Sequence, residues 1–298
     1  IEVFDIRGDN LTSPKLAYKL PLSTGLGPHD ITFNADGSRA YVAALSHSLI
    51  LDTTDLAAPK VVGTVVDPAI SIHHQADPIT VDDPILGTRT FMVVSDELAG
   101  VIQGSGACPG GGLHIYDVTG DLERTPVKVG AFFIPQVAPP GQVAHLRCSA
   151  HVFRAYKAPD GRNLMTIAWY GAGVRVLDIS GLAGVAVGIE NGIGTVGAGI
   201  KQIGYFFFPD DQTFPGSYGS ETWSAKVHHF DPDGSAYIFA NDLVRGFDVY
   251  RFDASKPEAV DPGEWLAGTT PALRTPSRAE YKPFCVLIAE RNGGGGVK

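Results

Sequence analysis

Residues 113–120 read LHIYDVTG, and four other segments repeat this pattern of alternating apolar residues followed by Asp or, in the last of them, by Arg251. The other four are IEVFDI (1–6), SLILDTT (48–54), VRVLDISG (174–181) and FDVYRFD (247–253). They recur at intervals of about 50 to 70 residues, which suits one four-stranded blade per interval with loops of varying length. The repeat therefore predicts an all-β fold, a β-propeller of four-stranded antiparallel blades.

Each interval also divides into four strand-like segments, which we name strands A to D in chain order. In the first interval they are PKLAYKLPL (14–22), HDITFN (29–34), RAYVAAL (39–45) and SLILDTT (48–54). The turns NADGS (34–38) and DPDGS (231–235) contain the Asp-Gly pair of tight hairpins, because glycine tolerates the positive φ that such turns require. Four complete blades are expected in residues 1–253.

Closure of the propeller involves residues outside these four blades. The chain opens on a D-like strand that no A, B or C strand precedes, and residues 254–298 contain no full blade. An open arc would leave sheet edges unpaired, so about five to seven blades are expected. The C-terminal segment 254–298, or sequence outside this chain, would complete or cap the propeller.

The D-strand motifs LILD, IYDVT and VLDIS are associated with A-strand segments of the form PKVVG (59–63) and PVKVG (126–130). Together these motifs resemble the LVIVD-repeat family of bacterial β-propellers over roughly residues 1–253. The resemblance implies the fold. It implies no particular activity, because most members of that family have no known function.

The composition of the chain bears on its binding partners and on the cellular compartment in which it works. The net charge of −9 is spread along the 298 residues, which argues against a nucleic-acid partner, and no apolar stretch approaches the ~20 residues of a membrane span. Low charge and a feasible disulfide between Cys108 and Cys148, with Cys285 left free, predict an exported protein, periplasmic or extracellular. Its signal segment would lie outside this chain. The oligomeric state is left open.

Histidines recur at one position of the predicted blades. They stand at or just before the start of strand B, at His29, His73, His74, His151, His228 and His229. The start of B lies beside the end of C in an antiparallel meander, so Asp96, Glu97 and Asp242, which end two of the C strands, are expected at the same end of the propeller. The sequence thus predicts one axial site assembled from several blades.

Neutral imidazoles suit transition metals rather than calcium or magnesium. We expect one ion, with iron or copper favoured and zinc as an alternative, and expect the three carboxylates to orient the ligands or to move protons. Adjacent residues of a strand point to opposite faces, so one histidine of each pair should bind. Matching AHVF (150–153) to VHHF (227–230) selects His228 with His151, whereas the choice between His73 and His74 stays open.

The sequence therefore favours a metal-dependent oxidoreductase or oxygenase that acts on a small organic substrate. Its general plan resembles two groups of His-lined propellers, the carotenoid-cleaving oxygenases and the selenium-binding/methanethiol oxidase proteins. Alternatives are a metal-assisted hydrolase or lactonase, a metal-free acid–base site that uses histidine with Asp96 or Asp242, and a non-enzymatic extracellular binding propeller with structural histidines. We expect His47, His114 and His145 to be structural.

Overall fold

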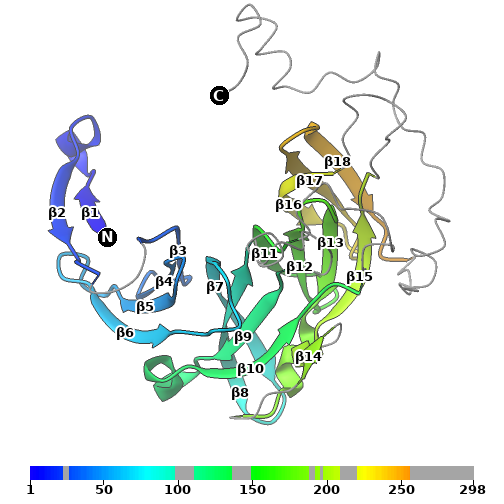
Figure 1. Cartoon of the computed structure of the whole chain (residues 1–298), viewed down its shortest axis with the longest axis horizontal. Coiled ribbons are helices and arrows are strands. Elements are labelled where there is room, and N and C mark those ends of the chain that lie inside the picture. Colours follow the sequence, from blue (N-terminus) through cyan, green and yellow to red (C-terminus); the bar gives the residue numbers. More distant parts are fainter. Residues whose placement is uncertain are drawn as a thin grey trace, which may run out of the picture.

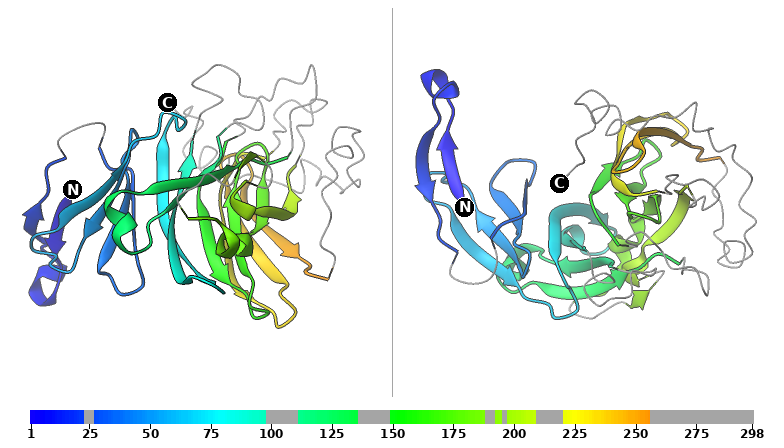
Figure 2. Two further views of the ribbon diagram at one scale, coloured as in Figure 1. Left: turned by 90° about the horizontal axis from the view of Figure 1, so that it is seen from below. Right: turned by 45° about the horizontal axis from the view of Figure 1, so that its top comes forward.

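The computed structural model describes residues 1–22, 27–97, 111–135, 149–187, 192–194, 197–208 and 220–255. Within them the chain forms successive β-sheets that follow one another along an arc (Figures 1 and 2). Each sheet is an antiparallel meander of strands adjacent in the sequence, apart from one short parallel strand. The fold is a β-propeller of four-stranded blades, which confirms the predicted fold class.

Five sheets make up the described part of the arc. The first pairs β1 (Glu2–Asp5) with β2 (Lys15–Lys19), and the second has the order β3 (Asp30–Phe33), β4 (Arg39–Ala43), β5 (Ser48–Asp52) and β6 (Lys60–Val65). The third contains β7 (His73–Asp83), β8 (Gly87–Asp96), β9 (Leu113–Asp117), β10 (Val127–Phe132) and β14 (Ile193–Gly194). The fourth contains β11 (Phe153–Lys157), β12 (Asn163–Ala168), β13 (Val174–Asp178) and β15 (Lys201–Phe206), and the fifth contains β16 (Thr222–Phe230), β17 (Ala236–Asp242) and β18 (Gly246–Phe252).

Helical structure in the described residues consists of short 3₁₀ turns. They are η1 (Gly8–Leu11), η2 (Gly120–Arg124), η3 (Ser180–Gly184) and η4 (Gly197–Gly199). Among the described residues there is no helix with the length and apolar character needed to cross a membrane.

The grouping of strands into blades differs from the predicted A-B-C-D order. Each predicted A strand pairs with the D strand that precedes it: β6 with β5, β10 with β9, and β15 with β13. A blade is therefore built as B-C-D-A, and the described residues hold three such complete blades, one two-stranded sheet and one three-stranded sheet. The predicted C-terminal segment lies outside the described residues from residue 256 onward.

Packing between neighbouring sheets supplies the hydrophobic core. Along β8, Phe91 and Val93 face the blade that follows, while Met92 and Val94 face the blade that precedes. Both faces of this sheet are buried, which explains why β8 carries the continuous apolar run FMVV (91–94) rather than an alternating pattern. The sheet of β16–β18 has one buried face, so β17 alternates, with buried Ile238 between exposed Tyr237 and Phe239.

The inner strands β3, β7, β11 and β16 lie nearest the centre of the arc (Figure 1). Side chains from three of them are joined by hydrogen bonds: Thr32 Oγ1 donates to Asp77 Oδ1 at 2.6 Å, and Arg154 Nη1 donates to Asp77 Oδ2 at 2.9 Å. Hydrogen bonds between Gln75 and the backbone of Phe153 add a second link between β7 and β11. These contacts hold the starts of the inner strands in a fixed relation to one another.

Candidate metal centre

Four residues occupy the same position in successive blades, each directly before a residue of the inner strand that pairs with the end of the neighbouring strand. The pairs that define the position are Asp30 with Ala43, Gln75 with Ser95, Val152 with Ala168, and Ser224 with Asn241. The residues that precede them are His29, His74, His151 and Trp223. Three histidines and a tryptophan thus stand at one end of the inner strands.

The rings of these four residues form an unbroken series across the blades. Ring centroids are 4.3 Å apart for His29 and His74, 4.1 Å for His74 and His151, and 4.3 Å for His151 and Trp223. His151 is fully buried and His74 nearly so, whereas His29 is exposed and Trp223 is 41% exposed. The series therefore runs from the surface through a buried centre and back to the surface.

The same type of hydrogen bond occurs in two blades and determines which nitrogen of the imidazole carries the proton. His29 Nδ1 lies 3.0 Å from the carbonyl of His74, and His151 Nδ1 lies 2.5 Å from the carbonyl of Trp223. A carbonyl oxygen only accepts, so Nδ1 is the protonated nitrogen in both rings. In the neutral imidazole, Nε2 then carries a lone pair, which is the form that binds a metal ion.

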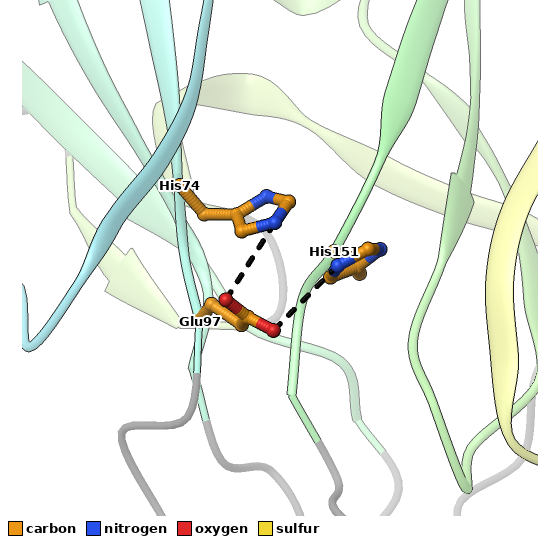
Figure 3. A group of neighbouring side chains, drawn as sticks. All are labelled: His74, Glu97 and His151. Carbon is orange, nitrogen blue, oxygen red and sulfur yellow. Dashed lines mark ion pairs between the residues drawn. The ribbon is translucent and has the colours of Figure 1, made fainter. Parts of the chain in front are cut away.

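Glu97, which directly follows β8, places its carboxylate between the two buried histidines (Figure 3). Its Oε2 lies 3.5 Å from His74 Nε2 and its Oε1 lies 3.6 Å from His151 Nε2. All three donor atoms lie within 4.8 Å of one another, and all three residues are buried. Two nitrogens and one carboxylate oxygen therefore converge on one small volume.

This arrangement fits a bound cation. The separations of 3.5 and 3.6 Å are too long for good hydrogen bonds, yet an ion about 2 Å from each donor atom fits between them. The Nε2 lone pair that the Nδ1 hydrogen bond leaves on neutral His151 lies beside the Glu97 carboxylate, an unfavourable contact that a cation held by the three residues would relieve. A buried carboxylate also needs a positive partner, and the ion pairs of Glu97 among the described residues are those with these two histidines.

Burial favours the neutral form of His74. Burial first, and then the neighbouring imidazoles of His151 and His29, together lower the pKa of this side chain to about 2. His74 Nδ1 is also buried, without a hydrogen-bond partner among the residues that the structure describes. A neutral imidazole keeps the lone pair that a metal ion requires.

Tyr170 and Trp223 belong to the site but had no assigned role in the sequence prediction. The Tyr170 hydroxyl donates to Glu97 Oε1 at 2.5 Å, and its ring lies 4.7 Å from that of His151. Trp223 packs edge-on against Tyr170 at 6.0 Å. The position of Tyr170 at the end of a C strand was the available signal, whereas nothing in the sequence marked the residues before VHHF as the start of β16.

The other predicted histidines lie elsewhere. His228 and His229 are exposed near the end of β16, not at its start, so the match of AHVF to VHHF does not hold in the structure. His73 is buried and its Nδ1 is 2.8 Å from Ser48 Oγ. His74 rather than His73 faces Glu97, which resolves that pair geometrically.

Two of the predicted carboxylates, Asp96 and Asp242, accept hydrogen bonds from backbone amides instead of contacting the histidines. Asp96 Oδ1 accepts from the amides of Ser71 and Ile72, and burial raises the pKa of Asp96 to about 6. Asp242 is its counterpart in the fifth sheet, where Oδ2 accepts from the amide of Glu221 at 2.7 Å. Both fix the approach to an inner strand, and Glu97 is the carboxylate that reaches the histidines. His145 and the three cysteines, with the predicted disulfide, lie outside the described residues.

His114 lies at the interface between the first two complete blades, and its burial is expected to destabilise the folded state at low pH. Its side chain is 2% exposed, and its Nδ1 is 4.0 Å from Asp67 Oδ2. Within the described part of the chain, neither ring nitrogen has a hydrogen-bond partner. Burial, with a smaller contribution from Lys128, lowers the pKa of His114 to about 4. The folded state therefore keeps His114 neutral at pH values where the unfolded chain takes up a proton.

The free energy of unfolding is therefore expected to decrease as the pH is lowered from about 6.5 to about 4. Between pH 6.5 and 4, His114 should remove about 3 kcal/mol from the free energy of unfolding. Urea denaturation at several pH values measures the slope, and His114→Phe should flatten it. His229→Phe is the control, because that imidazole is exposed. An unchanged slope in His114→Phe would contradict the assignment.

Comparison with known proteins adds only fold-level similarity. No protein-family model matches the chain, so membership of the LVIVD-repeat family stays a prediction. No curated protein matches it either.

Three solved structures illustrate the degree of likeness. The periplasmic gluconolactonase PpgL of Pseudomonas aeruginosa is 14% identical with a TM-score of 0.40, over 76% of this chain and 54% of that one. The pyranose dehydrogenase PQQ domain of Coprinopsis cinerea is 17% identical with a TM-score of 0.36, over 80% and 54%. The PilY1 C-terminal domain of Pseudomonas aeruginosa is 11% identical with a TM-score of 0.41, over 72% and 43%. The chain spans about half the length of each.

Proposed function

We propose that the chain is a metal-dependent oxidoreductase that acts on a small organic substrate, with one ion held by His74, His151 and Glu97. The observation that supports it is the convergence of these three buried donors within 4.8 Å. Two histidines and one carboxylate with open positions are the donor set of mononuclear iron(II) oxygenases. Compared with the all-histidine set expected from the sequence, the carboxylate favours iron over copper.

A substrate would approach the ion along the ring series, from the side of Trp223 or of His29. Trp223 takes the place that a fourth histidine would occupy, and it is 41% exposed. His29 is exposed at the other end of the ring series, with its Nε2 lone pair available to a further ligand. A bound iron would supply oxygen activation, while the two buried histidines and Glu97 would hold it and keep bulk water from its protein side.

A metal-assisted hydrolase is the second candidate, and the same donor set supports it. Two histidines and one glutamate also bind the catalytic zinc of several hydrolases, where the ion activates a water molecule. The predictions of the two functions differ. The oxidoreductase requires a redox-active ion and oxygen, whereas the hydrolase works with zinc in the absence of oxygen.

Nitric oxide tests the oxidoreductase without knowledge of the substrate. Protein loaded anaerobically with iron(II) should bind one ion per chain and should give the high-spin EPR signal of an iron–nitrosyl site when nitric oxide is added. Glu97→Gln keeps the shape of the side chain and removes its charge, so it should lower iron affinity by about tenfold or more. Asp242→Asn is the matched control and should bind iron as the unmodified chain does.

The outcomes separate the candidates. A nitrosyl signal, together with oxygen uptake when a panel of small organic substrates is added, supports the oxidoreductase. Tight zinc binding with turnover of lactone or ester substrates under nitrogen supports the hydrolase instead. Absence of any bound ion contradicts both and leaves a non-enzymatic binding propeller with structural histidines.

We also propose that the protein is exported. Low charge and the feasible pairing of Cys108 with Cys148 support this location. Fractionation of cells that express the full-length gene tests it, and recovery in the cytoplasmic fraction alone would contradict it.

A further inference from the structure

Among the described residues, Tyr170 is the one whose side-chain hydroxyl donates a hydrogen bond to Glu97. Its Oη donates to Glu97 Oε1 at 2.5 Å, and the residue is fully buried. The same oxygen is the one that faces His151 Nε2 at 3.6 Å, while Oε2 faces His74 Nε2 at 3.5 Å. The two oxygens of Glu97 are therefore in different surroundings.

The fold itself does not require tyrosine at this position. Tyr170 has a left-handed backbone, with φ of 37°, in the turn between β12 and β13, and it pairs with Thr222 of the next sheet. Leu45 occupies the same turn of an earlier blade, with φ of 61°, and pairs with His73. Leucine thus meets the same backbone demand without a hydroxyl. The hydroxyl of Tyr170 is therefore not needed for the turn, and its contact is the hydrogen bond to Glu97.

The ring of Tyr170 is fixed by contacts with two aromatic rings. It packs 4.7 Å from His151 and edge-on to Trp223 at 6.0 Å, with an interplanar angle of 87°. A hydroxyl carried by a fixed ring fixes the rotation of the carboxylate that accepts from it. Donors that bind a ligating carboxylate in this way orient it and tune its affinity for the ion.

We infer that Tyr170 is a positioning residue that makes Glu97 bind the ion through Oε2 alone, and so keeps one coordination position open for an external ligand. This inference rests on the proposed metal centre. The hydroxyl occupies Oε1, which weakens that oxygen as a second ligand atom. A carboxylate free to bind through both oxygens would fill the position that a substrate or oxygen needs.

Cobalt(II) is a suitable probe, because its absorption spectrum reports coordination number and no substrate is needed. The test compares the unmodified chain with Tyr170→Phe, which removes only the hydroxyl. Tyr116→Phe is the matched control, since the Tyr116 hydroxyl also donates at 2.5 Å to a carboxylate, that of the partly buried Asp67, which is not a member of the His74–Glu97–His151 group. Each protein is titrated with cobalt(II) and then with azide as an external ligand, and its thermal unfolding is recorded.

Tyr170→Phe is expected to bind cobalt(II) about 10- to 100-fold more weakly. It should also show the weaker visible bands of a higher coordination number and a reduced affinity for azide. Tyr116→Phe should match the unmodified chain in all three measurements, even where its thermal stability falls. A purely structural role for Tyr170 would change stability without changing the spectrum.

Two results overturn the inference separately from the metal centre. Identical cobalt spectra and azide affinities for Tyr170→Phe and the unmodified chain would remove the positioning role while the metal centre stands. Failure of the unmodified cobalt protein to bind azide would do the same, and it requires no variant. Absence of cobalt binding by the unmodified chain would instead contradict the proposed metal centre, and the inference with it.

Discussion

Replacing His151 with alanine is expected to lower the affinity for iron(II), cobalt(II) or zinc by more than about 100-fold, a larger loss than that of a residue that only orients a ligand. His151 is fully buried, its Nδ1–H is fixed on the carbonyl of Trp223, and its Nε2 faces Glu97. Alanine removes one of three protein donors and leaves a cavity in its place. Metal titration with a competing chelator measures the change.

His228→Ala provides the control for this prediction. His228 was the sequence-based partner of His151, but it is exposed near the end of β16. Its replacement should leave the metal affinity unchanged. Equal losses in the two variants would mean that the ion is bound somewhere other than between the blades, and an unchanged affinity in His151→Ala would contradict the proposed centre.

Arg89→Ala is expected to give the largest loss of stability, about 3–5 kcal/mol in the free energy of unfolding. The side chain of Arg89 is 2% exposed, and its Nη2 donates to Asp117 Oδ2 at 2.6 Å. Its Nη1 donates to the carbonyl of Val185 at 2.5 Å and so links the sheet of β7–β10 to the segment after η3. Truncation leaves the buried Asp117 without its cation. Urea denaturation measures the loss.

Arg251→Ala is the control, because Arg251 pairs with Asp231 at a similar distance of 2.7 Å at the surface. Exposed pairs contribute at most about 1 kcal/mol, so this variant should unfold close to the unmodified chain. Comparable losses in the two arginine variants would contradict the role of burial. A loss below about 1 kcal/mol in Arg89→Ala would show that the Asp117 charge is relieved by solvent or by rearrangement.

The repeat predicted the fold class, but it did not reveal which strands share a sheet. The D-strand pattern marked β5, β9 and β13 correctly, since apolar alternation that ends at Asp is a local property. Whether strand A joins the following B strand or the preceding D strand depends on hydrogen bonds between segments, and both choices give the same order along the chain. The pairing of β6 with β5 settled it.

The sequence also identified part of the candidate site. His29, His151 and the pair His73-His74 stand at the starts of strands whose apolar pattern was clear, so the shared position could be inferred from the sequence, although the choice within the pair could not. The fifth sheet differs because β16 begins at Thr222, in a polar and aromatic segment without strand-like alternation. VHHF forms the last four residues of β16, at the opposite end of the strand from the equivalent position, which Trp223 occupies.

The role of Glu97 could not be separated from that of Asp96 by sequence alone. Both end strand C of the same blade, and neighbouring residues point in different directions. The structure shows Asp96 binding the backbone amides of Ser71 and Ile72, while Glu97 reaches the two imidazoles. The direction of a side chain just beyond a strand depends on the loop that follows, which alternation does not predict.

Anomalous diffraction from crystals of the cobalt(II)-loaded protein tests the central claim most directly. The account predicts one strong peak about 2 Å from His74 Nε2, His151 Nε2 and Glu97 Oε2, with Glu97 Oε1 on the Tyr170 hydroxyl. A strong peak at His228 and His229, or no peak between the inner strands, would contradict it.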